Sequence, residues 1–399
     1  MLRLAEDLRA RGRQAAADSV LRALFDNPDR DIRLEARFRF ARSLSARGHF
    51  AEAIEQFDRI LVERPSAAPV RLELAKALEL SGDHARSLRE FSRLRAGALP
   101  ANLAREIDQV VSTLRSRRKF GGSVEIGIAP DSNVNGATAA TTVLINGLPF
   151  LLDPDARRRS GLGLEGAAQL YARYPINGKT QLVVEALGRG TVYRDAGLDE
   201  GVVQLGVGPE FGNRLRLSVF GSRRWYLGQG YSWSYGGTAQ WLKPVSRRAT
   251  LDFSARAEHL MVPRSEALDG DAYTASIALE RALRPSLFAR VSVSGSRYQA
   301  RAPVYSTSSI ETAMLLAKDF GPLSIYARTS YSHLRADGLF LGVQREDNRL
   351  DLGAGISLRR IRLWNASPVI RVTRIVNDSS AILYDTARTK VEVALSRPF

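Results

Sequence analysis

The feature that most constrains this chain is a change in hydrophobic period near Lys119. Residues 1–118 carry apolar side chains at spacings of three and four, whereas residues 119–399 alternate apolar and polar side chains with a period of two. A helix and a strand need these different periods to present one apolar face. The sequence therefore predicts a helical domain over residues 1–118 and a β domain over residues 119–399.

The helical part shows three similar units. Gly12, Gly48 and Gly82 are 36 and 34 residues apart, and each is followed by a small residue five positions on and a larger apolar residue four positions later. These pairs are Ala17 with Leu21, Ala53 with Phe57, and Ser87 with Phe91. The period resembles that of tetratricopeptide repeats. An ordinary bundle of helical hairpins is the alternative, and residues 99–118 are expected to form a final capping helix.

The β part is divided into fourteen alternating segments. One face of each segment is aliphatic and the other is charged or small, as in Leu251–Glu258. A soluble sandwich would show the same alternation in any single strand. The number of strands and the lengths of the connectors must therefore distinguish a membrane barrel from a soluble β domain. The segments are 119–128, 159–174, 179–190, 200–211, 213–226, 231–243, 247–260, 270–283, 286–298, 306–320, 322–333, 346–360, 362–376 and 386–399.

The connectors alternate between short and long. The short ones fall at 175–178, 212–213, 244–246, 284–285, 321 and 361, and the longer polar ones at 129–158, 191–199, 227–230, 261–269, 299–305, 334–345 and 377–385. An even number of strands with short turns on one side is typical of outer-membrane barrels, which close so that no strand edge meets lipid. The predicted fold is thus α plus transmembrane β: tetratricopeptide-like helical repeats followed by a 14-stranded antiparallel outer-membrane β-barrel.

The charged residues of the strands are expected to face the lumen of this barrel. They could form ion pairs that stiffen the wall or line a polar conduit, and both readings stay open. The formal net charge of +16 is spread along alternate strand positions, which argues against a nucleic-acid partner. The expected lumen residues are Glu165, Arg173, Glu185, Arg189, Arg214, Arg216, Arg256, Glu258, Arg290, Arg328, Asp351, Arg359 and Arg371.

No catalytic, metal or cofactor site is predicted, and we expect no enzyme. The chain has no cysteine, and its four histidines are far apart in sequence. Residues 161–166 match the GxGxxG spacing, but the preceding residues 155–160 are polar, whereas a dinucleotide fold needs an apolar strand there. A barrel hydrolase built on His259 is the remaining enzymatic alternative; it would need a nearby serine and an orienting group.

The end of the chain has its own pattern. Phe399 is preceded by Leu395, Val393 and Val391 on one face of the last strand. A terminal Phe closing such a strand resembles the signal that the barrel-assembly machinery reads, although Arg397 and Pro398 depart from it. This machinery and outer-membrane lipid are therefore expected partners.

A short motif suggests a family. The first strand runs into Pro130, Asp131, Ser132, Asn133, Val134 and Asn135. Together with the helical repeats and the barrel ending in Phe399, this motif resembles the surface lipoprotein assembly modulators (Slam proteins). The resemblance implies an outer-membrane translocator of surface lipoproteins, or of soluble haemophore-like proteins, with its helical domain in the periplasm.

The resemblance also suggests where partners bind. We expect the repeats to bind the client or a periplasmic chaperone through a groove, and the 129–158 loop to lie at the outer mouth. The groove residues are Glu35, Phe38, Arg42, Leu72, Lys76 and Glu79. Met1–Gly12 lacks the apolar core of an export signal, so the signal is expected to lie outside this chain. An exopolysaccharide export porin with a tetratricopeptide adaptor is the alternative function, although such porins usually have longer repeat arrays and sixteen strands.

Overall fold

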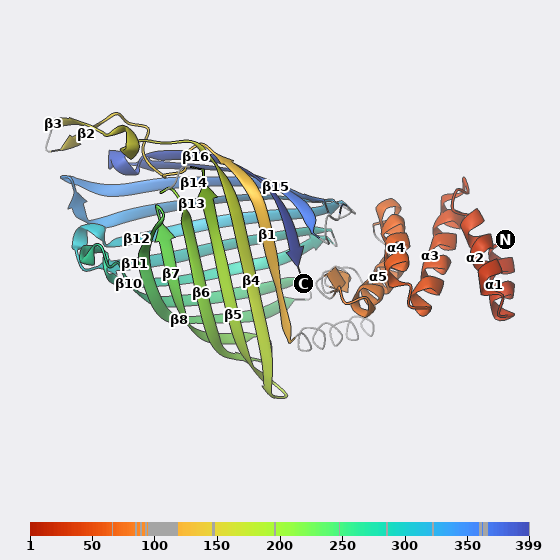
Figure 1. Ribbon diagram of the computed structural model, residues 1–399. Coiled ribbons are helices and arrows are strands. Elements are labelled where there is room, and N and C mark those ends of the chain that lie inside the picture. The colour runs from red at the N-terminus through yellow and green to blue at the C-terminus, as the bar shows by residue number, and fades with distance from the viewer. Residues whose placement is uncertain are drawn as a thin grey trace.

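The computed structural model has a helical N-terminal part followed by a closed barrel (Figure 1). It describes residues 1–65, 67–83, 86–87, 90–91, 94, 119–145, 148–194, 197–246, 248–284, 286–320, 323–358, 361 and 366–398. The predicted fold class is confirmed. The predicted capping helix and the domain boundary at residue 118 fall on residues 95–118, which lie outside the described residues.

Five helices precede the barrel. They are α1 Leu2–Ala10, α2 Gln14–Ala23, α3 Arg30–Ala46, α4 Phe50–Glu63 and α5 Ala68–Leu80. The carboxylate of Asp29 caps α3 by accepting the backbone N–H groups of Asp31 and Ile32. None of the helices in the described part of the chain is long and apolar enough to cross a membrane.

The three predicted hairpin turns are confirmed as glycine turns. Gly12, Gly48 and Gly82 have φ values of 74°, 81° and 84°, which only glycine adopts without strain. The small residues that follow them, Ala17, Ala53 and Ser87, are completely buried. The larger members of each pair, Leu21, Phe57 and Phe91, are buried as well. The packing therefore repeats with the glycine spacing, while the tetratricopeptide assignment itself stays a prediction.

The barrel has fourteen antiparallel strands, and each strand pairs with its neighbours in the chain until the last strand pairs with the first. The strands are β1 Phe120–Asp131, β4 Gly161–Asn177, β5 Thr180–Tyr193, β6 Glu200–Phe211, β7 Leu215–Tyr226, β8 Gln229–Ser246, β9 Ala249–Met261, β10 Gly270–Arg284, β11 Leu287–Ala300, β12 Thr307–Phe320, β13 Leu323–Phe340, β14 Val343–Leu358, β15 Ser367–Ser379 and β16 Thr386–Pro398. We call the end where β1 begins and β16 ends the inner end, and the opposite end the outer end.

Two of the predicted longer connectors are wrong. At 227–230, strands β7 and β8 are joined by Leu227 and Gly228 alone. Residues 334–345 are not a long loop, because β13 continues to Phe340 and β14 begins at Val343. The turn consists of Leu341 and Gly342, both with positive φ, as in a type I′ turn. The alternation reverses near the outer end of β13, because the outward row becomes polar at His333 and Arg335 while the inward row becomes apolar at Leu334 and Ala336. The pattern therefore no longer marks a strand.

The sequence also missed a hairpin in the long first loop. Strands β2 Thr142–Ile145 and β3 Leu148–Leu151 pair antiparallel outside the barrel sheet. They lie beyond the outer end of β1 (Figure 1). Each strand has only four residues, which is too short for a period of two to be recognised in sequence.

The outer face of the barrel is aliphatic, as the alternation predicts. Val124, Ile126 and Ile128 of β1 are each about half exposed, and Leu205 of β6 and Val219 of β7 are more exposed still. Large exposed apolar side chains in such rows require a nonaqueous surrounding. The barrel therefore presents a lipid-facing exterior and a polar lumen.

The helical packing generates a prediction. Phe57 is completely buried between helices, so Phe57→Ala should lower the free energy of unfolding of the helical part by about 3–5 kcal/mol. Val62→Ala on the same helix is the control, because Val62 is 53% exposed. The measurement is the urea dependence of proteolytic cleavage within residues 1–80 of the full chain. Equal cleavage of the two variants would contradict this packing.

A candidate functional site at the seam of the barrel

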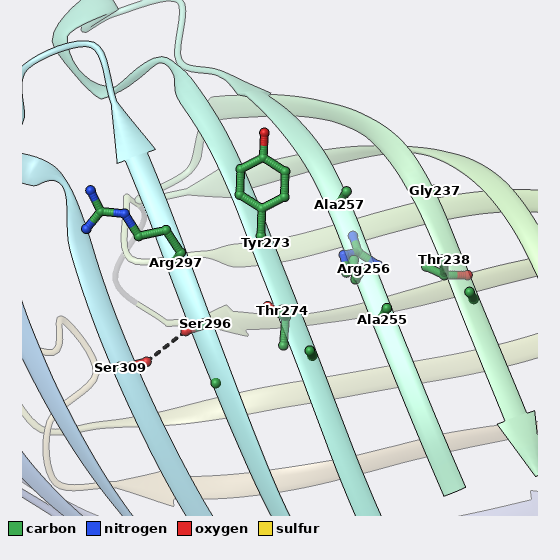
Figure 2. A pocket seen from close by; sticks show the side chains of 13 residues that line it. Gly237, Thr238, Ala255, Arg256, Ala257, Tyr273, Thr274, Ser296, Arg297 and Ser309 are labelled. Atoms are coloured by element: carbon green, nitrogen blue, oxygen red, sulfur yellow. Dashed lines mark hydrogen bonds between the residues drawn. The ribbon is translucent and has the colours of Figure 1, made fainter.

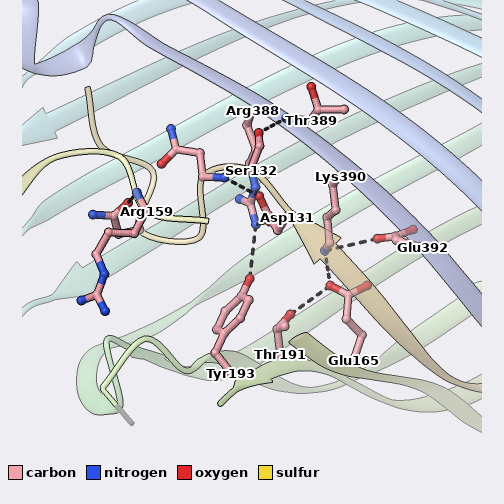
Figure 3. Close-up of polar contacts among 12 residues, drawn as sticks. Asp131, Ser132, Arg159, Glu165, Thr191, Tyr193, Arg388, Thr389, Lys390 and Glu392 are labelled. Atoms are coloured by element: carbon pink, nitrogen blue, oxygen red, sulfur yellow. Dashed lines mark hydrogen bonds and ion pairs between the residues drawn. The ribbon is translucent and has the colours of Figure 1, made fainter. Parts of the chain in front are cut away.

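The family-motif residues lie at the outer end of β1. Pro130 and Asp131 are the last residues of that strand, and Ser132, Asn133 and Asn135 begin the loop that follows. Figure 3 shows Asp131 and Ser132 at this point. The loop starts as a compact Asx turn, because the backbone N–H of Asn133 donates to the Asp131 carboxylate at 2.9 Å. The motif is therefore ordered by its own side chains before it meets the rest of the barrel.

Asp131 joins the first strand to the last. Its carboxylate is fully buried and accepts a hydrogen bond from Nε of Arg388 on β16 at 2.7 Å. Arg388 also lies 3.5 Å from the hydroxyl oxygen of Tyr193 on β5. The resulting charge-assisted contact crosses the lumen side of the β1–β16 pair.

Ser132 and Asn133 extend this contact to the backbone of β16. The N–H of Ser132 donates to the carbonyl of Thr389 at 3.0 Å, and the N–H of Thr389 donates to Oγ of Ser132 at 2.8 Å. The amide of Asn133, which is completely buried, donates to the carbonyl of Ala387 at 3.2 Å. The motif thus continues the hydrogen bonding to β16 beyond the point where β1 ends.

Asn135 holds the two limbs of the long loop together. Its amide donates to the carbonyl of Arg157 at 2.7 Å and its Oδ1 accepts the N–H of Arg159 at 3.0 Å. The hydroxyl of Tyr226 donates to the carbonyl of Asn135 at 3.2 Å. The motif therefore connects the returning limb of the loop, a distant strand and the last strand of the barrel.

We call the β1–β16 pair the seam. Its register runs without a break from Ser123 opposite Pro398 to Ile128 opposite Val393, and resumes at Asp131 opposite Lys390. Between these points Ala129 and Pro130 have no partner on β16, although both pair with β4 on the other side. Proline has no N–H to donate to a ladder, so the gap is built into the motif. The β6–β7 pair has a similar gap at Pro209.

Ion pairs in the lumen cross the seam as well. Arg371 on β15 donates to Glu125 on β1 at 2.7 Å, passing over β16. Lys390 on β16 pairs with Glu165 on β4, passing over β1 (Figure 3). Removing one partner of such a partly buried pair leaves the other charge uncompensated, which is more costly than losing both. Side chains therefore support the seam where its backbone ladder is interrupted.

The other predicted lumen charges are also largely paired across the wall. Arg216 contacts Glu210 at 2.7 Å and Glu185 at 3.1 Å, and Arg290 contacts Asp252 at 3.2 Å. These ion pairs support the reading in which the charged residues stiffen the barrel wall. Residues of both charge signs still line the lumen. Two predicted members differ: Arg214 lies in the β6–β7 turn and not in a strand, because β7 begins at Leu215, and Arg359 lies outside the described residues.

Sequence reasoning missed the partners of the motif. It identified Asp131 but not Arg388 or Tyr193, and it placed Arg371 in the lumen without Glu125. The signal available in the sequence was the period of two, which places these side chains on the lumen-facing row of their strands. That row shows which face a residue occupies, but not which residue of the first strand faces which residue of the last.

The predicted groove residues lie on two helices, with α4 between them in the chain. Glu35, Phe38 and Arg42 are on α3, and Leu72, Lys76 and Glu79 are on α5. The guanidinium of Arg42 lies over the Phe38 ring, 5.9 Å from its centroid, and Glu35 pairs with Arg39 at 2.6 Å. Their role in binding stays a prediction.

The predicted insertion signal lies partly in the described structure. Val391, Val393 and Leu395 are on the outward row of β16, where Val393 faces Ile128 and Leu395 faces Ile126 across the seam. Phe399 lies outside the described residues. Recognition of this signal by the assembly machinery stays a prediction.

The two enzymatic alternatives gain no support from geometry. Residues 161–166 begin β4 and pair with β1, so the GxGxxG spacing belongs to a strand and not to a phosphate-binding turn. His259 contacts Asp271 at 2.8 Å and the ring of Tyr235 on the outward face. Within the described contacts of His259, neither partner is a serine.

The lipid-facing wall is hollowed over β8 to β12. The hollow has a volume of about 770 Å³ and is bordered by Tyr273 and Arg297 (Figure 2). Small outward residues leave this space, because a methyl group or a hydrogen replaces the branched side chains found elsewhere on the exterior. These residues are Gly237, Ala239, Ala255, Ala257, Ala275 and Gly295.

The seam contacts generate a prediction. Asp131→Ala should destabilise the barrel by about 3 kcal/mol, because Arg388 loses its buried partner. The measurement is the temperature at which the folded barrel is lost in heat-modifiability gels. Asp153→Ala, in the exposed part of the same loop, is the control and should have little effect. The exchange Asp131→Arg with Arg388→Asp should recover part of the loss; no recovery would contradict a direct pair.

Comparison with known proteins agrees with this architecture. The family model described as surface lipoprotein assembly modifier matches residues 120–399, which include the whole barrel. Surface lipoprotein assembly modifier 1 of Haemophilus influenzae is 27% identical over 215 residues, which cover 53% of this chain and 43% of that protein. The hemophilin secretion modulator of Acinetobacter baumannii is 24% identical over 254 residues, covering 58% and 51%.

A third relative extends into the helical part. The surface lipoprotein assembly modifier of Moraxella catarrhalis is 23% identical over 382 residues, which cover 90% of this chain and 72% of that protein. The chain spans about half the length of the first two relatives. Because the family model covers most of the sequence, the chain belongs to the surface lipoprotein assembly modifier family, and its barrel lies in the bacterial outer membrane.

Proposed function

We propose that this protein delivers a surface lipoprotein, or a related secreted protein, across the outer membrane. The observation that supports this most directly is the joining of a helical domain to a closed barrel whose seam carries the motif of residues 130–135. Two relatives are named for surface lipoprotein assembly and one for hemophilin secretion, which indicates the two kinds of client.

The helical domain is proposed to lie in the periplasm and to bind the client or its chaperone. It precedes β1, and β1 begins at the inner end of the barrel. A rigid concave face of repeats suits an extended or partly folded polypeptide. The glycine spacing of residues 161–166 belongs to strand β4 and not to a phosphate-binding turn, so the driving force is proposed to be client folding or binding outside the cell.

The seam is proposed as the route for a client that carries acyl chains. Such a client needs water for its polypeptide and hydrocarbon for its lipid at the same time. A gap between two strands is where a polar lumen and a lipid-facing exterior can meet. The β1–β16 ladder is already interrupted at Ala129 and Pro130, and ion pairs such as Arg388 with Asp131 support it. Opening it would require fewer backbone hydrogen bonds to break than an unbroken ladder would.

The function is tested by co-expression with a lipoprotein encoded beside it. Surface exposure of that lipoprotein, measured by protease access on intact cells, should rise with this protein and fall when its gene is deleted. Unchanged exposure in the deletion strain would contradict the proposal.

The route is tested in the same assay by crosslinking. The chain has no cysteine, so the pair Ile126→Cys with Leu395→Cys can form a single disulfide across the seam. Under oxidising conditions delivery should be lost, and a reductant should restore it. The control pair Val291→Cys with Met314→Cys joins β11 to β12 and should leave delivery intact. If both oxidised pairs deliver the client equally, the lumen and not the seam is the route.

The groove is tested by charge reversal. Arg42→Glu combined with Lys76→Glu should weaken client capture by the full chain about tenfold or more, since both side chains are exposed on the proposed surface. Arg59→Glu with Arg64→Glu removes the same charges from other exposed positions and is the control. Capture is measured as co-purified client, and equal losses in the two variants would argue against the groove.

The alternative of exopolysaccharide export is less well supported. Fourteen strands, about three helical units and the family match all favour protein delivery. Conductance and sugar transport by the protein in a planar bilayer would instead support the exopolysaccharide export porin.

A further inference from the structure

Exposed cations surround the inner end of the barrel. We call them the cationic collar: Lys119, Lys179, Arg214, Lys243, Arg248, Arg281, Arg284, Lys318 and Arg397. They lie in the inner turns or in the last strand positions before them. Three described carboxylates lie near this rim: Glu210 pairs with Arg216, Glu280 pairs with Arg290, and Asp319 lies beside Ser324. The collar therefore carries a large excess of positive charge.

The collar differs from the outer rim in whether its cations are paired with carboxylates. At the outer end, arginines are paired with carboxylates, as in Arg297 with Asp337 at 2.5 Å and Arg301 with Glu266 at 2.6 Å. Within the described part of the chain, the collar residues form no ion pair with a carboxylate of the protein. Cations gathered around a rim repel one another unless an external anion lies among them.

Aromatic side chains place the collar at a membrane interface. Lys243 lies over the ring of Trp241, 5.6 Å from its centroid, and Lys318 lies over Phe320 at 4.5 Å. Phe120, Tyr174 and Phe211 are exposed near the same end, beside other collar residues. An aromatic belt marks the boundary of the hydrocarbon, and lysine or arginine beside it reaches the level of the lipid phosphates.

We propose that the cationic collar binds the phosphate groups of anionic phospholipids in the inner leaflet of the outer membrane. Lys243, Arg281 and Lys318 lie on outward rows of their strands, in register with the aliphatic residues that face lipid. An acidic polypeptide would instead need cations directed away from the membrane. The positions next to aromatic side chains and the outward rows therefore favour a lipid surface, which a cluster of basic residues attracts by charge.

The test uses the full chain in neutral detergent micelles, titrated with phosphatidylglycerol or phosphatidylcholine. Retained lipid is counted by native mass spectrometry. The wild-type protein should retain phosphatidylglycerol in preference, and high salt should remove the preference. The variant Lys179→Gln, Arg214→Gln, Lys243→Gln and Lys318→Gln should bind phosphatidylglycerol at least about tenfold more weakly.

The control removes the same charge from the outer rim. It carries Arg264→Gln, Arg301→Gln, Arg335→Gln and Arg374→Gln, all at exposed positions, and should bind phosphatidylglycerol like the wild type. Equal retention of the two lipids by the wild type, or an equal loss in both variants, would overturn the proposal. Collar-dependent binding of polyglutamate without a preference for phosphatidylglycerol would overturn it in favour of an acidic polypeptide. If the collar variant fails to fold, the wild-type protein still tests the proposal, because a preference for phosphatidylglycerol that high salt does not remove would contradict binding by charge.

Discussion

The structure depends on one constraint: in hydrocarbon, each backbone N–H and C=O group must find its partner within the protein. Fourteen strands satisfy this by closing on themselves, and closure brings the first strand to the last. In that pair the ladder is interrupted, because Ala129 and Pro130 have no partner on β16, and the β6–β7 pair has a similar gap at Pro209. The motif loop supplies hydrogen bonds just beyond the gap, through Ser132 and Asn133.

The lumen charges follow from the same closure. A barrel of this width is not filled by side chains alone, so charged residues can face water inside it. They are arranged in pairs that join neighbouring or next-neighbouring strands, such as Arg216 with Glu185 and Lys390 with Glu165. These pairs stiffen the wall and also line it, so the two readings left open by the sequence describe the same residues.

Much of this architecture could be predicted from sequence, because the period of two and the glycine spacing are local signals. Leu251–Glu258 shows both faces of a strand within eight residues, and Gly48 with Ala53 shows a helical turn and its packing. The pairing of Asp131 with Arg388 could not be predicted, since it joins residues 257 positions apart through a register that alternation does not encode. The extension of β13 to Phe340 was missed because the apolar and polar rows exchange faces after Tyr331.

The bonds of Asn133 have a thermodynamic consequence. The same side chain donates to Ala137 within the long loop and to Ala387 on the last strand. A macromolecule that displaced the loop from outside would therefore change the free energy of strand pairing in the membrane. Linkage makes this reciprocal: any event that separates the two strands must alter, by the same factor, the affinity of the loop for a macromolecule that binds it.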